Sequence, residues 1–125
     1  MRPTHDLLRP PTDEEVARAV RRFAEEVAGL YGRELVGLYL YGSRARGDHH
    51  PHSDVDVAVV LRDGPWAEAE ETDRLGDLTY DILIEEGADI QALAVAESAW
   101  ADPARHSNPS LVRTMRRDGR RLVIP

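Results

Sequence analysis

The amino-acid sequence predicts a domain of the α/β or α+β class, in which a small β-sheet is flanked by helices. Some segments carry apolar residues at steps of three and four, which is the period of a helix packed on one side. Short runs rich in β-branched and aromatic residues lie between these segments and are typical of buried strands. Because the two kinds of segment interleave, we expect helices that cover a sheet.

The length of the chain sets the number of domains. Its 125 residues suffice for one compact core and are too few for two. We therefore expect a single domain over residues 12–125. Residues 1–11 contain three prolines and no periodic pattern, and we expect them to form an irregular N-terminal arm.

The first predicted helix begins at a capping box. The Thr12 hydroxyl can accept a hydrogen bond from a backbone amide, and Glu15 can reach back to the start of the helix. The helix should end near Gly32, and its apolar face comprises Val16, Val20, Phe23, Val27 and Leu30.

Two strands are predicted in the middle of the chain. Residues 36–41 form a short apolar and aromatic run that Gly42 stops, and residues 44–48 predict one or two helical turns. Residues 55–61 are rich in β-branched side chains and predict the second strand. The turn sequence Asp63-Gly64-Pro65 follows it.

A further helix is expected to run to about Glu86 and to end at Gly87. Its inner face comprises Leu75, Leu78 and Ile82. Residues 89–95 predict a third strand.

The last predicted helix begins after Ser107-Asn108, with Pro109 at its first position, and ends at Gly119. Its apolar stripe comprises Leu111, Val112 and Met115. We expect residues 122–124 to add a short edge strand.

Composition excludes several classes of site. Cysteine is absent, which rules out disulfides, a thiolate zinc site and a cysteine nucleophile. No segment has the apolar length of a membrane span or the pattern of a signal peptide, so we expect a cytoplasmic protein without a membrane partner. The formal net charge of −7 argues against a general nucleic-acid binder, although it leaves a specific nucleic-acid contact open.

The most informative motif joins a glycine–serine bend to two aspartates. Gly42-Ser43 follows the first predicted strand, and Asp54 and Asp56 open the second. Side chains alternate along a strand, so both carboxylates point to the same face. Carboxylate oxygens are ligands that Mg²⁺ prefers, and a pair of metal ions can neutralise a triphosphate and align the attacking and leaving oxygens.

The bend supplies complementary groups for a phosphate. Gly42 lets the backbone approach the anion without a side chain in the way. The Ser43 hydroxyl can donate to a phosphate oxygen, and Arg44 and Arg46 can add charge-assisted hydrogen bonds. The motif therefore predicts nucleotidyl transfer from a nucleoside triphosphate.

Each half of this motif can also be explained without a functional role. A glycine–serine pair after a strand is a common turn, and an Asp-x-Asp sequence is usually solvated. Asp56, however, stands inside a run of valine and alanine, where an unpaired charge is costly to bury. Its position implies a cation or a hydrogen-bond partner.

The stretch from Gly42 to Asp48, followed by Ser53-Asp54-Val55-Asp56, closely resembles the signature of the minimal nucleotidyltransferases. These are small members of the DNA polymerase β-like superfamily. The resemblance implies a mixed-sheet nucleotidyltransferase fold and Mg²⁺-dependent transfer of a nucleotide, commonly AMP from ATP, to a hydroxyl acceptor. It implies that Gly42 and Ser43 contact the triphosphate and that Asp54 and Asp56 bind two Mg²⁺ ions.

The family also carries a third carboxylate on a later strand, which binds metal and assists deprotonation of the attacking hydroxyl. The best match here is Asp89, at the start of the third predicted strand. Asp81, within the preceding predicted helix, is the other candidate.

Relatives of this kind are often paired with a helical partner of the HEPN type. The resemblance thus implies the antitoxin half of a toxin–antitoxin pair that adds AMP to its partner. Two alternatives remain: an inert nucleotidyltransferase fold that neutralises a partner by contact, and adenylylation of an aminoglycoside. Self-association also stays open.

Arginines gather near the C-terminus, and they form either a patch that binds a partner or a solvated face. They are Arg113, Arg116, Arg117, Arg120 and Arg121.

Overall fold

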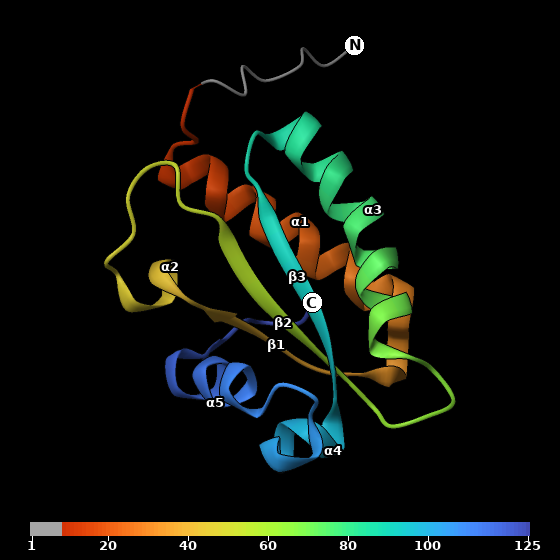
Figure 1. The fold of residues 1–125 in the computed structure, drawn as a ribbon. Coiled ribbons are helices and arrows are strands. Elements are labelled where there is room, and N and C mark those ends of the chain that lie inside the picture. Colours follow the sequence, from red (N-terminus) through yellow and green to blue (C-terminus); the bar gives the residue numbers. More distant parts are fainter. Residues whose placement is uncertain (1–8) are drawn as a thin grey trace.

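The computed structural model describes residues 9–125. It contains a four-stranded sheet in the order β3-β2-β1-β4 (Figure 1). Strands β1 and β2 are antiparallel, as are β1 and β4, whereas β2 and β3 are parallel. The predicted mixed sheet flanked by helices is therefore confirmed. Most of the predicted N-terminal arm, residues 1–8, lies outside the described residues.

Helix α1, Asp13–Tyr31, begins with the predicted capping box. The Glu15 amide donates to Thr12 Oγ1 at 3.1 Å, and the Thr12 amide donates to Glu15 Oε1 at 2.9 Å. These bonds satisfy two of the amides that a helix start leaves without partners. After α1, a turn of 3-10 helix at Gly32–Glu34 leads into the sheet.

The central hairpin consists of β1, Leu35–Tyr41, and β2, Val55–Leu61. The short helix α2, Ser43–Arg46, lies in the connection between them. Helix α3, Glu68–Glu86, then carries the chain to β3, Ile90–Ala96. A helical crossover of this kind is what two parallel neighbouring strands require.

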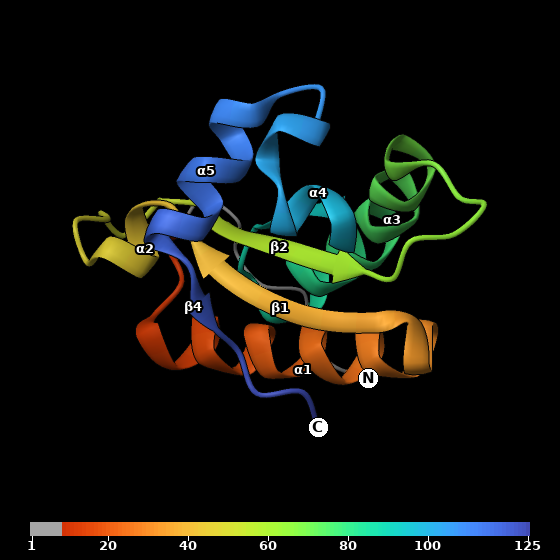
Figure 2. The ribbon, with the colours of Figure 1, turned by 90° about the horizontal axis from the view of Figure 1, so that it is seen from below.

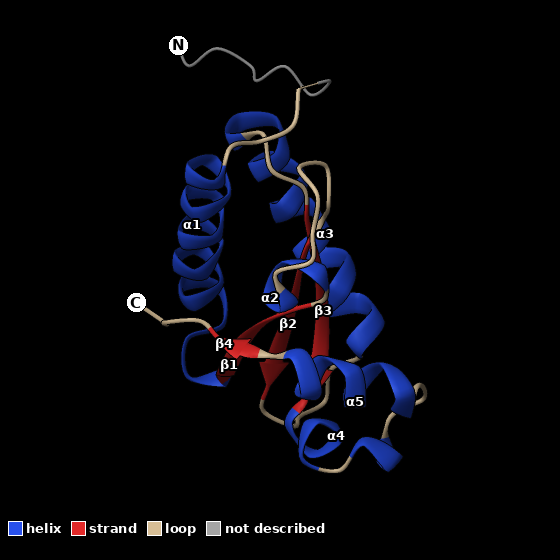
Figure 3. Ribbon diagram, turned by 90° about the vertical axis from the view of Figure 1, so that its left-hand side faces the viewer, coloured by secondary structure: helices blue, strands red, loops and turns tan. Residues whose placement is uncertain are grey.

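The C-terminal part lies on the other side of the sheet. It comprises α4, Glu97–Ala101, a 3-10 turn at Pro103–Arg105, and α5, Pro109–Asp118. Figure 2 shows α1 on one side of β1 and β2, with α4 and α5 on the opposite side. Figure 3 shows the same arrangement from another direction, with the strands between α1 and α5.

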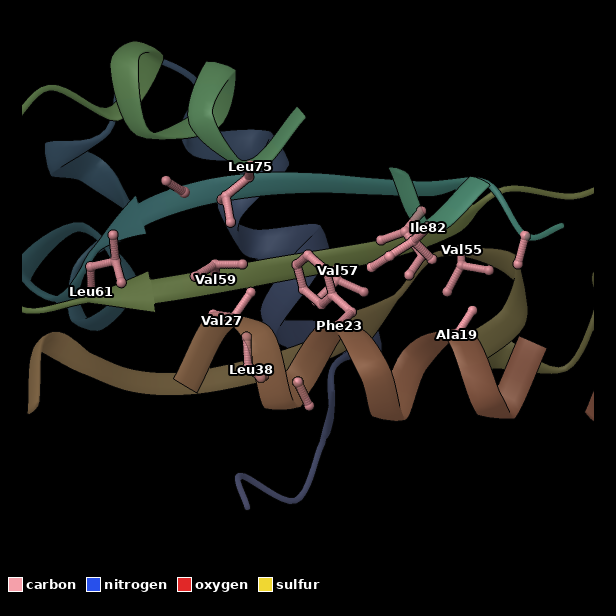
Figure 4. Packing of buried hydrophobic residues seen from close by; sticks show 14 residues of the cluster. Ala19, Phe23, Val27, Leu38, Val55, Val57, Val59, Leu61, Leu75 and Ile82 are labelled. Atoms are coloured by element: carbon pink, nitrogen blue, oxygen red, sulfur yellow. The ribbon is translucent and has the colours of Figure 1, made fainter. Parts of the chain in front are cut away.

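Both faces of the sheet are therefore covered. The alternating residues Val55, Val57, Val59 and Leu61 of β2 pack against α1 and α3 in the larger core (Figure 4). On the other face, Ala58 packs in a second cluster with Val112 and Met115 of α5. A strand buried on both faces has a nearly continuous apolar sequence, which is what β2 shows.

Three features differ from the sequence-based expectations. The predicted strand at residues 122–124 is wrong: the last strand is β4, Arg120–Arg121, which pairs with Tyr39 and Leu40. The chain joins the sheet edge directly after α5, so the pairing occurs before the apolar residues. Helix α4 and the 3-10 turns were not predicted, because such short segments carry no helical period.

None of the helices in the described part of the chain is both long and apolar enough to cross a membrane.

Candidate functional site

The sheet register brings three aspartates to one place. Asp54 directly precedes β2, and Asp89 directly precedes β3. Val55 pairs with Ile90, and the Val55 amide donates to the Asp89 carbonyl at 2.9 Å. Asp54 therefore lies beside Asp89, one step before the paired residues. The same register places Asp56 next to Gln91. Residues two apart on a strand share a face, so the three carboxylates lie on the same side of the sheet.

The three carboxylates influence one another electrostatically. Burial and the nearby charge of Asp89 raise the pKa of Asp54. Burial, the charge of Asp54 and that of Asp89 raise the pKa of Asp56. Arg44 opposes the first shift and Arg46 opposes the second, yet both shifts remain upward. The cluster thus carries negative charge that its neighbours only partly neutralise, which is a suitable environment for a cation.

Gly42 forms the bend that faces this cluster. Its φ is +77°, and a Cβ built at this position would overlap Asp56 Oδ2 and lie 3.3 Å from Asp56 Cγ. Any side chain at residue 42 would therefore displace the carboxylate. Tyr41, the preceding residue, pairs with Asp56 across the hairpin. The predicted neighbourhood of the glycine bend and Asp56 is thus present in the structure.

Ser43 opens α2 directly after the bend. The Gly42 carbonyl accepts the amides of Ala45 and Arg46 at 3.1 Å each, which fixes the turn. The Ser43 residue is partly exposed, and within the described part of the chain no bond to its hydroxyl is found. This hydroxyl is available to a ligand.

Arg44 holds the loop that joins the bend to the aspartates. Its Nε donates to the Ser53 carbonyl at 3.0 Å, and its Nη2 donates to the Pro51 carbonyl at 3.3 Å. These bonds fix the backbone just before Asp54. The structure gives Arg44 a positioning role, and its contact with a phosphate stays a prediction.

Arg46 makes two ion pairs. Its Nε lies 3.1 Å from Asp48 Oδ2, and its Nη1 lies 2.8 Å from Asp118 Oδ2 at the end of α5. The Asp118 side chain is only 5% exposed. This contact could not be predicted from the sequence, because its partners lie 72 positions apart and in different elements. Arg46 therefore links the segment after the Gly42 bend to α5.

Carboxylate oxygens are the ligands that a divalent cation such as Mg²⁺ prefers, so the three aspartates suit such an ion chemically. Within residues 9–125, no three carboxylate or imidazole groups converge into a finished metal site. Asp89 Oδ1 accepts a hydrogen bond from Gln91 Nε2 at 2.8 Å. This bond occupies one of the two carboxylate oxygens of Asp89. Sequence reasoning missed this role of Gln91 as a partner of Asp89.

Asp81, the alternative third carboxylate, is exposed on α3. The neighbouring residue Ile82 packs in the core on the other face of the sheet. Of the two candidates, Asp89 is the one that interacts with Asp54 and Asp56.

The C-terminal arginines are all exposed, on α5 and β4. Arg117 pairs with Asp118 at 3.1 Å, and the Arg121 guanidinium lies 5.9 Å from the Tyr39 ring centre. Their role as a partner-binding patch stays a prediction.

Comparisons with known proteins agree with this arrangement. Residues 20–98 match the model of the nucleotidyltransferase domain family. The chain is 31% identical over 74 residues to a Methanocaldococcus jannaschii protein named "Putative protein adenylyltransferase MJ0141". The aligned region covers 56% of this chain and 75% of that protein. It is 33% identical over 101 residues to the bifunctional uridylyltransferase/uridylyl-removing enzyme of Pseudomonas putida. That alignment covers 68% of this chain and 11% of that enzyme.

Among solved structures, a toxin–antitoxin with AMP-PNP aligns at a TM-score of 0.46 and 20% identity, over 90% of this chain and 73% of that chain. A likeness at this level does not bear on function. The family match, by contrast, extends over more than half of the chain and includes the bend, the paired aspartates and Asp89. The protein therefore belongs to the nucleotidyltransferase domain family and is an enzyme of that class.

Proposed function

We propose that the protein is a Mg²⁺-dependent adenylyltransferase that moves AMP from ATP to a hydroxyl group of a protein acceptor. The observation that carries the proposal is the cluster of Asp54, Asp56 and Asp89 on one face, with Asp56 against the Gly42 bend. The similarity to a relative named as a protein adenylyltransferase supports the choice of acceptor.

The chain supplies binding and proton-handling groups for this reaction. Asp54 and Asp56 would hold Mg²⁺, with Asp89 completing the set. When bound, the Mg²⁺ ions neutralise the triphosphate and stabilise the attacking and leaving oxygens. Gly42 allows the phosphates to approach the backbone, and the Ser43 hydroxyl donates to a phosphate oxygen.

Two further residues act around the triphosphate. Asp89 lies beside Asp54 at the start of β3, where its carboxylate can accept the proton of the attacking hydroxyl. Arg46 can donate to the leaving pyrophosphate after it exchanges one of its aspartate partners for a phosphate.

We further propose that the acceptor is a helical protein of the HEPN type, so that this chain acts as the antitoxin of a pair. The resemblance of the Gly42–Asp56 stretch to the minimal nucleotidyltransferases supports this partner. An inert fold that neutralises the same partner by contact would bind it equally well. The two functions differ in whether AMP becomes attached to the partner.

Mass spectrometry of the candidate acceptor after incubation with ATP and Mg²⁺ tests the proposal. We expect a mass gain of one AMP with the wild-type protein and none with Asp56→Asn. Asp77→Asn, which removes an exposed carboxylate from α3, serves as the matched control and should retain transfer. An acceptor that is bound but never modified would refute the proposed activity and support the contact mechanism.

A further inference from the structure

A cavity lies on the same face of the sheet as the carboxylates, farther along β3. Its volume is about 310 Å³, and it opens between β3, α3 and α5. We name it the β3 pocket; the residues that matter here are Thr72, Leu93, Val95, His106, Leu111 and Met115. Leu93 and Val95 follow Asp89 and Gln91 at steps of two, so all four side chains share one face of β3. The pocket is therefore continuous with the face that carries the site.

We propose that the β3 pocket anchors the protein acceptor by taking one large apolar side chain, aromatic or aliphatic, while a hydroxyl of the same acceptor reaches Asp89. This inference rests on the proposed function, because it assigns a place to the acceptor of that reaction.

The direction of attack places the acceptor over β3. The Gly42 bend follows β1, on one side of Asp56, and Asp89 lies on the other side, directly before β3. In a displacement at phosphorus the attacking and leaving oxygens are aligned on opposite sides. If the pyrophosphate leaves toward the bend, the hydroxyl enters from β3. The pocket lies along the same strand.

The spacing suits a short extended segment of polypeptide. Leu93 is four residues and Val95 six residues from Asp89, which corresponds to about 13–20 Å along a strand. An extended acceptor segment of about four to six residues spans the same distance. A hydroxyl residue and an apolar residue at this separation can thus occupy both places at once.

Hydrogen bonds between α3 and β3 hold the walls of the pocket in place. The Ala94 amide donates to Thr72 Oγ1 at 3.1 Å, and the Ala96 amide donates to Glu68 Oε2 at 2.8 Å. Two amides on the outer edge of β3 are thus occupied by α3 side chains, so an acceptor strand cannot pair with them. Strand pairing is thus closed at these two amides, whereas the pocket stays open to a side chain.

His106 fixes one end of the pocket. Its Nε2 lies 3.1 Å from Glu68 Oε1, and its Nδ1 accepts the Asn108 amide at 2.9 Å. The ring is mostly buried, with 11% of its side chain exposed. These contacts join the start of α3 to the segment before α5, so the pocket is held open between two anchored elements. The partly exposed Leu111 supplies its apolar wall, and Met115 lies fully buried at the same wall.

Methionine provides a direct probe of pocket occupancy. The chain has two methionines, Met1 and Met115, and Met115 lies buried at the pocket wall, where an occupant would alter its surroundings. The probes are soluble peptides with one tyrosine and one phenylalanine at varied separations, together with analogues in which alanine replaces phenylalanine. NMR of ¹³C-methyl-methionine protein follows Met115 during titration, and labelled ATP with Mg²⁺ reports AMP transfer to the tyrosine.

We expect peptides with a separation of about four to six residues to shift the Met115 signal saturably. Phenylalanine should lower the Kd by about tenfold or more relative to alanine, since a buried aromatic side chain contributes this much. Ala69→Trp fills the mouth of the pocket from an exposed position on α3 and should abolish the shift. Ala17→Trp, an exposed alanine on α1 beyond the other face, is the matched control and should leave the shift unchanged.

Two outcomes would overturn the inference. In the first, AMP transfer is equally efficient without phenylalanine and in Ala69→Trp. In the second, ATP and Mg²⁺ alone shift Met115 whereas no peptide does, which would make the pocket a nucleotide site. Failure of the proposed function looks different: phenylalanine peptides would shift Met115 as expected, but no peptide would acquire AMP.

Discussion

At the residue scale, Asp56 is the exception within its strand. Every other residue of β2 is buried, and the two faces of the strand pack in separate clusters. A strand selected for stability alone would place an apolar residue there. The Asp56 carboxylate lies against the bend, and burial and the charge of Asp54 raise its pKa.

Replacing Asp56 with asparagine should therefore separate stability from activity. The folded-state pKa of the Asp56 carboxyl is raised above its ordinary value of 3.8. Ionised Asp56 therefore lowers the free energy of unfolding progressively as pH rises above 3.8. In the absence of divalent ions, Asp56→Asn should thus unfold at a higher temperature than wild type at neutral pH, and the difference should shrink toward low pH. Nucleotide transfer should fall by about 10²-fold or more. Calorimetry at several pH values measures the first effect. A lower unfolding temperature for the variant in chelator would contradict the repulsion described here.

A second prediction at the residue scale concerns Gly42. In Gly42→Ala, the positive φ and the overlap with Asp56 should together lower the free energy of unfolding by about 1–3 kcal/mol, and transfer should be lost. Gly29→Ala is the control, since a Cβ there meets nothing within 4 Å in helix α1. That substitution should be neutral or stabilising. Urea unfolding of both variants checks the contrast, and equal behaviour would show that the bend tolerates a side chain.

At the element scale, the start of α1 depends on a charged cap. Hydrogen bonds from Arg9 and from the Thr12 amide lower the pKa of Glu15 from 4.5 to about 2. The folded pKa is depressed, so this stabilisation is present above pH 4.5 and is lost as pH falls toward about 2. Glu15→Gln should lower the free energy of unfolding by about 1 kcal/mol at pH 7 and by much less at acid pH. Glu14→Gln removes a charge from the same turn without touching the cap. If both variants lose the same stability at pH 7, the cap is not the cause.

Helices α2 and α5 are joined by the Arg46–Asp118 ion pair. Asp118 competes with a triphosphate for Arg46 if this arginine binds phosphate. Asp118→Asn should then lower the KM for ATP by about two- to fivefold, which is the range expected for one ion pair whose arginine is solvent-exposed. Asp102→Asn, which removes an exposed partner of Arg105, is the control. Steady-state kinetics decide the point: an unchanged KM in Asp118→Asn would show that Arg46 does not bind the triphosphate.

At the scale of the whole molecule, local patterns predicted the elements better than their pairing. The bounds of β2 and the capping box of α1 match the prediction because apolar runs and caps act locally. The placement of Asp89 beside Asp54 depends on a parallel pairing across the 19-residue helix α3. The sequence offered Asp89 as one of two candidates, since register is set by packing of the whole sheet.

The contacts that connect the site to the rest of the fold could not be predicted. Arg46 meets Asp118, and Thr72 meets the Ala94 amide, across long separations along the chain. Such pairs form only when the helices pack on the sheet. Single residues in a sequence carry no signal of them.

Calorimetric titration with Mg²⁺ and a non-hydrolysable ATP analogue tests the central claim most directly. The claim is that the carboxylates beside the Gly42 bend hold a divalent cation together with the triphosphate. Wild-type protein should bind the analogue in the presence of Mg²⁺ and lose most of this affinity in chelator. Asp54→Asn and Asp56→Asn should bind weakly in both conditions. Equal, Mg²⁺-dependent binding by wild type and by both variants would contradict the claim.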